Sequence, residues 1–372
     1  MTAAPGPSLL AVGTAVPPHE LSQTVLRDWF AEQDGIDRLS ARLIRAAFDS
    51  SAIDRRHTVI PGLAEAREGL FADADGRLRS PRTRERNDLY RREAPVLSAA
   101  AARDALDQAE VAASEVTHVV TVSCTGLFAP GPDFKLVQDL GIPTTVERFH
   151  LGFIGCAAAF PGLRAAHHIC RSQPDAVVLV VCVELCSLHI RSSADPEQIV
   201  ASAVFADGAA AAVVAGGDRA ARRPRLEIDT FSTTITSEGE ADMDWSVGDH
   251  GFEMRLSAEV PKIVGREVRA AFSHAFGDSA HPAASAEAWA VHPGGRSVLD
   301  RVQQGLGLSD AMLDHSRAVL REYGNMSSAT VLFILRRILE DATLPADARV
   351  AGMAFGPGLT VETATFRRRA AQ

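Results

Sequence analysis

Three residues in this sequence carry the side chains needed for thioester chemistry, and each lies in a distinctive segment. Cys156 ends the segment Gly-Phe-Ile-Gly-Cys, His292 precedes Pro-Gly-Gly, and Asn325 precedes a predicted helix. A thiol can attack a thioester carbonyl, an imidazole can stabilise the thiolate, and a carboxamide can donate a hydrogen bond to a developing oxyanion. The set is suited to forming carbon–carbon bonds on an acyl group that is held as a thioester.

Cys156 is predicted to begin a helix over residues 156–172. A helix N-terminus has partial positive charge and unpaired N–H groups, so it should favour the thiolate and lower the cysteine pKa from about 8.5. The alternative is a buried structural cysteine, which is the commoner fate of a free cysteine.

His292 is expected at the carboxyl end of a strand over residues 286–292, where ligands gather in open α/β sheets. There it would hold Cys156 as a thiolate and donate to the thioester oxygen. Asn325 would be the second donor to the enolate that a malonyl thioester forms when it loses carbon dioxide. The alternatives are a hydrogen-bonded core histidine and the N-cap of a helix over residues 326–341.

Composition favours a large enzyme-like protein and disfavours several other classes. The chain has 372 residues and a net charge of −9, which argues against a nucleic-acid surface. Five cysteines without a repeated spacing do not indicate a disulfide framework, so a reduced, cytoplasmic setting is predicted. The longest apolar run, residues 176–183, is far shorter than the roughly 20 residues that cross a bilayer, so no membrane partner is expected. No CxxC, GxGxxG or Walker A segment occurs, which leaves metal and nucleotide chemistry without support.

Strands and helices alternate along the chain, and the strands are apolar on both faces. This pattern is typical of an α/β sheet that is covered on both sides. A basic, proline-containing break at residues 216–224 separates two halves that show a similar alternation of strands and helices. We therefore expect two domains, residues 1–222 with the cysteine and residues 223–372 with the histidine and asparagine. Strands are predicted over 8–14, 117–124, 146–150, 176–183, 208–215, 225–234 and 286–292, and helices over 93–110, 133–140, 156–172, 197–204, 256–276, 296–306, 309–322 and 326–341.

The order Cys, His, Asn, with the closing segment Phe-Gly-Pro-Gly-Leu-Thr-Val-Glu at residues 355–362, resembles type III polyketide synthases. This is the chalcone- and stilbene-synthase-like family of the thiolase superfamily, and the chain is most similar to its bacterial branch. The resemblance implies a thiolase-like, duplicated α-β-α-β-α five-layer fold with the site between the halves. It also implies a homodimer that uses an acyl-CoA starter and malonyl-CoA, with no cofactor and no metal.

The resemblance assigns roles to further residues. Phe205 and Met254 match a gate between the coenzyme A tunnel and an inner cavity. Arg55 and Arg56 fall in a basic segment near the coenzyme A phosphates, with a solvated surface arginine as the alternative for each. The positions implied to line the cavity are Cys124, Cys186, His189, Trp245 and Ser327. Because plant members have glycine where Trp245 stands, a plant-like chalcone product is not expected.

The predicted enzyme loads an acyl group onto Cys156 and extends it by decarboxylative Claisen condensation with malonyl-CoA or a substituted malonyl-CoA. Cyclisation then releases a pyrone or a resorcinol-type phenolic product. One alternative is a ketoacyl synthase III-like enzyme, which condenses once and transfers to a carrier protein. The other is a non-catalytic, thiolase-like partner subunit, which slow alkylation of Cys156 at neutral pH would favour. The closing segment and the intact Cys, His and Asn set favour the polyketide synthase.

Overall fold

The computed structural model describes residues 6–63, 67–216, 222–277 and 281–371. Within these ranges one mixed sheet of nine strands has the order β11-β12-β13-β8-β1-β7-β6-β4-β5. The first half of the chain supplies β1 (Ser8–Ala15), β4 (His118–Ser123), β5 (Glu147–Gly152), β6 (Val177–Leu185) and β7 (Asp207–Ala215). The second half supplies β8 (Arg225–Ile235), β11 (Ala288–Val291), β12 (Arg349–Gly356) and β13 (Thr360–Arg369).

The two groups of strands meet where β8 pairs with β1. The pairing is short, with Ser8 opposite Glu227 and Leu9 opposite Leu226. The domain boundary expected at residues 222 and 223 lies between β7 and β8, where the chain passes from one group of strands to the other.

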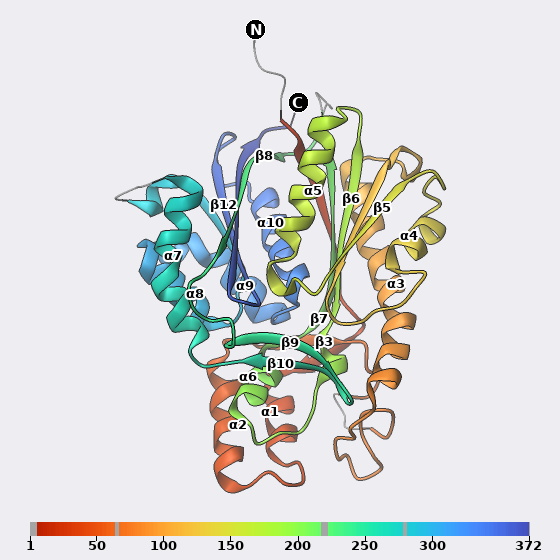
Figure 1. Cartoon of the computed structure of the whole chain (residues 1–372), viewed down its shortest axis with the longest axis vertical. Coiled ribbons are helices and arrows are strands. Elements are labelled where there is room, and N and C mark those ends of the chain that lie inside the picture. The colour runs from red at the N-terminus through yellow and green to blue at the C-terminus, as the bar shows by residue number, and fades with distance from the viewer. Residues whose placement is uncertain (1–5, 64–66, 217–221, 278–280, 372) are drawn as a thin grey trace.

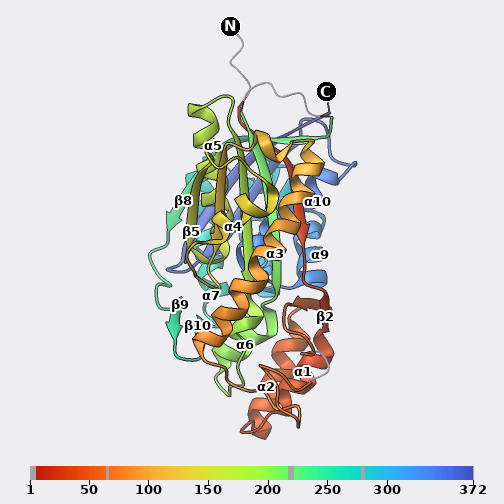
Figure 2. The same ribbon diagram turned by 90° about the vertical axis from the view of Figure 1, so that its right-hand side faces the viewer.

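Helices form the remaining layers. Two of them, α5 (Ala159–Ser172) and α10 (Thr330–Glu340), lie between the two groups of strands (Figure 1). The outer face of the first group is covered by α3 (Thr83–Ala109) and α4 (Pro132–Leu140), as Figure 2 shows. The outer face of the second group is covered by α7 (Val260–Phe276) and α8 (Arg296–Leu306), with α9 (Asp314–Tyr323) nearby. The order of layers is therefore the expected α-β-α-β-α.

The central layer is the most deeply buried part of the molecule. In α10 the side chains of Val331, Leu332, Ile334, Leu335 and Ile338 are fully buried. A helix that is apolar on most of its circumference is stable only when protein surrounds it. This packing fixes the starts of α5 and α10, next to which Cys156 and Asn325 lie.

Smaller elements sit at the lower end of the sheet in Figure 1. They are the helices α1 (Gln23–Ala31), α2 (Arg38–Ser50) and α6 (Pro196–Val204), and the strand pairs β2 (His19–Ser22) with β3 (Arg55–Thr58) and β9 (Met243–Gly248) with β10 (Gly251–Leu256). Within the described ranges, no helix has the length and apolar character to cross a bilayer.

Two helix starts and one strand pair are among the differences between the predicted elements and the structure. Helix α3 begins at Thr83, ten residues before the predicted start, because this polar segment is anchored by a buried arginine and not by an apolar stripe. Arg86 donates to the carbonyls of Pro81, Leu188 and Ile190. The helix predicted from Leu256 begins at Val260, because β10 extends to Leu256 and a turn over residues 257–259 precedes the helix. The β9–β10 pair was not predicted.

Candidate active site

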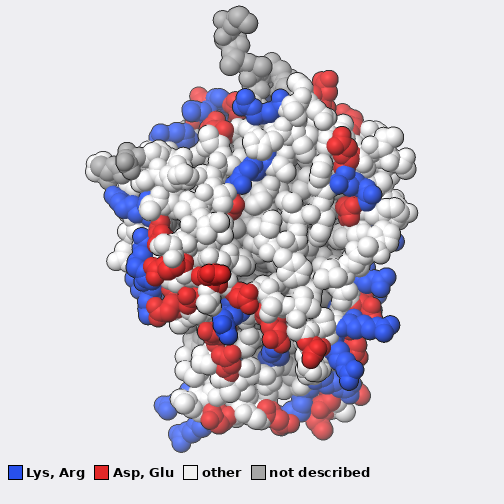
Figure 3. Space-filling model, in the orientation of Figure 1, with Lys and Arg blue, Asp and Glu red and all other residues white. Residues whose placement is uncertain are grey.

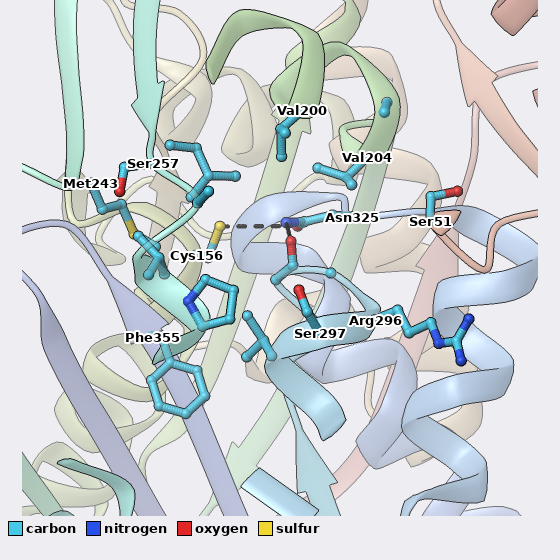
Figure 4. Close-up of a pocket in the computed structure, with 18 of the residues that line it drawn as sticks. Ser51, Cys156, Val200, Val204, Met243, Ser257, Arg296, Ser297, Asn325 and Phe355 are labelled. Carbon is cyan, nitrogen blue, oxygen red and sulfur yellow. Dashed lines mark hydrogen bonds between the residues drawn. The ribbon is translucent and has the colours of Figure 1, made fainter. Parts of the chain in front are cut away.

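Cys156, His292 and Asn325 line one cavity of about 490 Å³ (Figure 4). Cys156 lies in a 3-10 turn, Gly155–Ala157, just before α5. His292 directly follows β11, and Asn325 lies between α9 and a second 3-10 turn, Ser327–Ala329, that precedes α10. Residues from both halves of the chain therefore meet at one site.

The turn that holds the cysteine packs against the closing segment of the chain. Gly155 has φ +72°, and a Cβ there would lie 2.5 Å from the Pro357 ring. A Cβ on Gly356 would lie 2.8 Å from the Ile154 carbonyl oxygen. Glycine is therefore required on both sides of this contact, which explains why the two segments share a glycine-rich sequence.

Burial dominates the protonation of Cys156. The residue is 6% exposed, and burial raises the pKa of its thiol to about 11, although hydrogen bonds to Ser327 and Asn325 oppose the rise. The Sγ atom lies 3.9 Å from Asn325 Oδ1, a weak contact. The expected lowering of the thiol pKa by a helix N-terminus is therefore wrong. Cys156 also lies one short turn before α5, not in its first turn.

His292 is fully buried, and neither ring nitrogen has a hydrogen-bond partner among the described residues. Its backbone N–H donates to the Met353 carbonyl at 2.8 Å, which fixes the residue beside β12. Burial lowers the pKa of the imidazole to about 3, so the ring is neutral at pH 7. A buried imidazole without protein partners is costly unless a ligand uses it.

Asn325 is held by its backbone and by its side chain. Its N–H donates to the Val204 carbonyl at 2.8 Å, and its carbonyl accepts from Ala206 N at 2.9 Å. The Oδ1 atom accepts from Ser327 N at 2.8 Å, so the residue does cap the turn that precedes α10. The Nδ2 atom has only a long contact of 3.4 Å, to the Gly294 carbonyl. The cap thus orients the amide and leaves its N–H groups available near His292.

Phe205 and Met254 line both this cavity and a smaller one beyond it, which is the arrangement that a gate requires. The smaller cavity has about 30 Å³, room for about two water molecules. Its lining includes three of the residues implied to face a cavity, Cys186, His189 and Trp245.

Aromatic rings fill the space around the smaller cavity. His189 stacks on Phe252 with ring centres 4.5 Å apart and meets the edge of Trp245 at 5.6 Å. Trp245 Nε1 donates to the Cys124 carbonyl at 2.7 Å, and His189 Nδ1 accepts from Phe252 N at 2.9 Å. His189 Nε2, which then carries the proton, donates to the Thr125 carbonyl at 2.8 Å. These rings form an aromatic wall that is fixed by hydrogen bonds.

Cys124 and Ser327 lie in a buried polar network around Glu184, which was not predicted as a site residue. The Cys124 thiol lies 3.4 Å from a Glu184 carboxylate oxygen and 3.6 Å from the Ser327 hydroxyl. Ser328 and Thr125 donate to the same carboxylate at 2.5 and 2.9 Å. Burial raises the pKa of Glu184. The sequence did contain one indication of this network, because Glu184 is a single acid near the end of the otherwise apolar strand β6.

The two arginines implied to contact coenzyme A are not among the residues that line the large cavity. Arg56 is 3% exposed, and its guanidinium donates to the carbonyls of Ser202 and Phe205 at 2.8 and 2.7 Å. It therefore supports the gate segment and is not accessible to a phosphate, which corrects the prediction. Arg55 is exposed, lies 3.9 Å from Glu20, and is not among the residues that line the cavity.

Three other basic residues line the outer part of the large cavity and were missed. They are Lys262 at the start of α7 and Arg296 and Arg301 on α8. Lys262 pairs with Glu259 at 2.6 Å, and Arg296 lies 3.6 Å from Asp300. These residues come together at the mouth of the cavity only in the folded chain, so their spacing in the sequence did not indicate a shared site.

No group of three or more His, Cys, Asp or Glu side chains is placed to bind a metal ion in the part of the chain that the structure describes. The arrangement of layers and the thiol, imidazole and amide in one cavity define a condensing enzyme of the thiolase-like class.

Comparisons with known proteins agree with this class. The sequence model of the chalcone and stilbene synthase N-terminal domain matches residues 2–218, and that of the C-terminal domain matches residues 227–369. The chain therefore belongs to the chalcone and stilbene synthase family, the type III polyketide synthases, which are condensing acyltransferases.

Individual relatives show the same likeness. Probable polyketide synthase 1 of Dictyostelium discoideum is 30% identical over 361 residues, which are 95% of this chain but only 11% of that protein. The crystal structure of PKS-I from the brown alga Ectocarpus siliculosus has a TM-score of 0.90 and 28% identity, and covers 98% of this chain and 99% of that one. Tetrahydroxynaphthalene synthase from Streptomyces coelicolor A3(2), a bacterial type III polyketide synthase, has a TM-score of 0.87 and 27% identity over 98% and 100%. The thiolase-like fold is confirmed.

Proposed function

We propose that this protein loads an acyl group from an acyl-CoA onto Cys156 and extends it with units from malonyl-CoA or a substituted malonyl-CoA. Cyclisation then releases a pyrone or a phenolic ring. The observation that carries the proposal is the fully buried His292, whose two ring nitrogens lack partners among the described residues and which shares a cavity with a thiol and a primary amide. Coenzyme A thioesters are the substrates, and no cofactor takes part.

Loading starts from a neutral thiol and a neutral imidazole. As Cys156 Sγ attacks the acyl carbonyl, its proton passes to a free nitrogen of His292. The Sγ–acyl bond forms, the bond to the coenzyme A sulfur breaks, and His292 returns the proton to the departing thiolate. The ion pair predicted from the sequence is replaced by proton transfer during the attack, because burial disfavours both charges.

Extension uses the two remaining donors. The thioester oxygen of malonyl-CoA accepts from the N–H of neutral His292 and from Asn325 Nδ2, and loss of carbon dioxide leaves an enolate on that oxygen. The enolate carbon then attacks the carbonyl of the Cys156 thioester: a carbon–carbon bond forms, the Sγ–acyl bond breaks, and the sulfur leaves as a thiolate that takes a proton from water. Donors that the fold fixes before the reaction stabilise this charge without reorganisation.

Coenzyme A recognition is assigned to the basic side chains at the cavity mouth. Lys262, Arg296 and Arg301 come from two helices on one side of the opening and can reach the phosphates of a bound nucleotide. They take this role in place of Arg56, whose guanidinium is buried.

The proposal is tested by incubating the purified protein with a panel of acyl-CoA starters and malonyl-CoA and analysing the products by mass spectrometry. A cyclised product released without any carrier protein is expected. A single condensation product that forms only on a carrier protein would identify a ketoacyl synthase III-like enzyme. No acylation of Cys156 by any starter would favour the non-catalytic subunit.

Alkylation of Cys156 should depend steeply on pH. Below a pKa of about 11 the thiolate fraction rises about tenfold per pH unit. The rate of reaction with iodoacetamide should therefore rise about tenfold for each pH unit between pH 7 and 10. The rate is measured by intact mass, with Cys156→Ala protein to subtract other thiols. A rate that is already constant below pH 8 would show a preformed thiolate. Slow alkylation at neutral pH therefore no longer indicates a non-catalytic subunit.

Replacing Trp245 with glycine should enlarge the smaller cavity, because the indole forms part of the aromatic wall. We expect bulkier starters to be accepted, or one more extension, while loading of Cys156 is retained. Loss of so large a side chain costs up to about 3–5 kcal/mol, so the melting temperature must be recorded. Trp29→Ala is the control, since Trp29 Nε1 also donates to a backbone carbonyl, that of Gly76, at 2.7 Å. An unchanged product spectrum from folded Trp245→Gly protein would remove the role of Trp245.

The proposal includes a homodimer in a reducing, cytoplasmic setting. Strand β5 is at the edge of the sheet, and Phe149 on it and Phe153 just after it are 45% and 42% exposed. Figure 3 shows a broad area without charged side chains in the middle of this face, while Glu147 and Arg148 at the start of β5 are exposed. An unpaired strand edge with exposed aromatic side chains needs a cover, and a second copy would supply it. Light scattering should then give twice the chain mass of 39.6 kDa.

A further inference from the structure

Helix α2 presents an unusual outer face. Leu39 is 65% exposed and Leu43 is 41% exposed, and Arg38, Arg42 and Ala46 are exposed beside them. These five residues are called the α2 patch below. Two leucines side by side on a solvent-facing helix surface form a small apolar centre, and the flanking arginines are a residue type that is enriched at protein interfaces.

The charges of the α2 patch are available to a partner. Neither Arg38 nor Arg42 makes an ion pair or side-chain hydrogen bond with any residue that the structure describes. The neighbouring Arg45 has only a distant contact, 3.9 Å from Asp28. The acids of the same helix are already engaged, since Asp37 accepts from Ser40 N and Asp49 pairs with Arg27 at 2.7 Å, so the two arginines beside the leucines remain free to pair with a partner's acids.

The α2 patch is continuous with the mouth of the catalytic cavity. Ala47 and Ser50, in the last turns of the same helix, line the cavity that contains Cys156. At 3.6 residues per turn, Leu39, Leu43 and Ser50 lie within about 40° of one another around the helix axis. Leu39, at the outer end of the patch, therefore lies about 16 Å along the helix axis from Ser50 at the cavity opening, on the same helix face.

We propose that the α2 patch docks an acidic acyl carrier domain, whose phosphopantetheine arm enters the cavity and delivers a starter acyl group to Cys156. The inference rests on the proposed function. Coenzyme A and a carrier domain present the same arm, so the cavity that accepts one accepts the other. Coenzyme A and a carrier domain differ in the part that stays outside the cavity. The basic residues of α7 and α8 can bind the phosphates of the nucleotide, whereas exposed leucines cannot bind a phosphate and suit a protein surface.

Charge and shape both favour such a partner. An acidic helix beside the attachment point of the arm would meet Arg38 and Arg42, while Leu39 and Leu43 would be buried between the two helices. The reaction is thioester exchange. The Cys156 Sγ–acyl bond forms, the acyl–pantetheine sulfur bond breaks, and the cysteine proton passes through His292 to the pantetheine sulfur, so no oxidant or further reactant is needed.

The test compares three donors of the same hexanoyl group: hexanoyl-CoA, hexanoyl-pantetheine, and a hexanoyl-loaded acyl carrier protein of bacterial fatty acid synthesis. Loading of Cys156 is followed by intact mass. The carrier protein should load wild-type enzyme about tenfold or more faster than hexanoyl-pantetheine at equal concentration. Leu43→Glu and Arg42→Glu should each remove most of this advantage, about tenfold, while loading from hexanoyl-CoA stays unchanged.

Matched surface changes serve as controls. Ile235→Glu alters another apolar side chain, 74% exposed, and Arg84→Glu alters another exposed arginine, on α3; both should load normally from all three donors. The proposal is overturned if the carrier protein loads no faster than hexanoyl-pantetheine, or if the α2 variants slow loading from hexanoyl-CoA equally. It is also overturned if wild-type enzyme gains nothing from the carrier but binds phosphatidylglycerol vesicles through the α2 patch. Failure of every acyl-CoA starter, hexanoyl-CoA included, to load Cys156 would instead refute the proposed function; if another starter loads, its acyl group replaces hexanoyl in all three donors.

Discussion

Cys156→Ala protein should form no acyl adduct with any starter, while wild-type protein gains the mass of one acyl group. The reason is that Cys156 is the one cysteine among the described residues that line the cavity with His292, and without its sulfur no thioester can form there. Some decarboxylation of malonyl-CoA should survive, since His292 and Asn325 remain to stabilise the enolate. Intact mass spectrometry and detection of released carbon dioxide measure the two effects separately.

Cys182→Ala is the matched control for this experiment. Cys182 is also a buried free thiol, but it lies in strand β6 and not among the residues that line the cavity. Its replacement should leave the adduct intact. An adduct that persists in Cys156→Ala protein and disappears in Cys182→Ala protein would contradict the assignment of the nucleophile.

Asn325→Ala protein should still be acylated at Cys156 but should extend the acyl chain about 10²–10³ times more slowly. Loss of one oxyanion donor has this typical effect. The rate of product formation, measured alongside the acyl adduct, separates extension from loading.

The same change also removes the acceptor for Ser327 N–H, at a cost of about 1 kcal/mol in stability. Asp37→Ala provides the comparison, because Asp37 caps α2 by accepting from Ser40 N at 2.7 Å. It should lower the melting temperature by a similar amount without slowing extension of a CoA-bound starter. If Asn325→Ala protein extends chains within a few-fold of the wild-type rate, Asn325 is only a cap.

Local patterns predicted a sheet covered on both sides and singled out the three reactive residues, whereas the five-layer arrangement and the shared role of the three residues came from the resemblance to the family. Alternating apolar segments indicated the sheet and its helices, and the glycines near Cys156, His292 and Asn325 marked turns that the structure contains. The contact of Gly155 with Pro357 further shows that two motifs that are distant in the sequence belong to one site.

What the sequence could not show depends on burial and on distant contacts. Arg56 resembled a surface arginine, yet its partners are carbonyls 146 and 149 residues away. The pKa of Cys156 is set mainly by burial, which a helix-start pattern does not reveal. Lys262 and Arg301 become neighbours of the same cavity only through the packing of α7 on α8.

The central claim is decarboxylative condensation on Cys156, and uniformly ¹³C-labelled malonyl-CoA tests it most directly. The purified protein is incubated with an unlabelled acyl-CoA and the labelled extender, without carrier protein, and the products and released gas are analysed by mass spectrometry. We expect a cyclised product that gains two labelled carbons for each extension, with one labelled carbon dioxide released each time. A product without label, label incorporated without release of carbon dioxide, or hydrolysis of the starter alone would contradict the account.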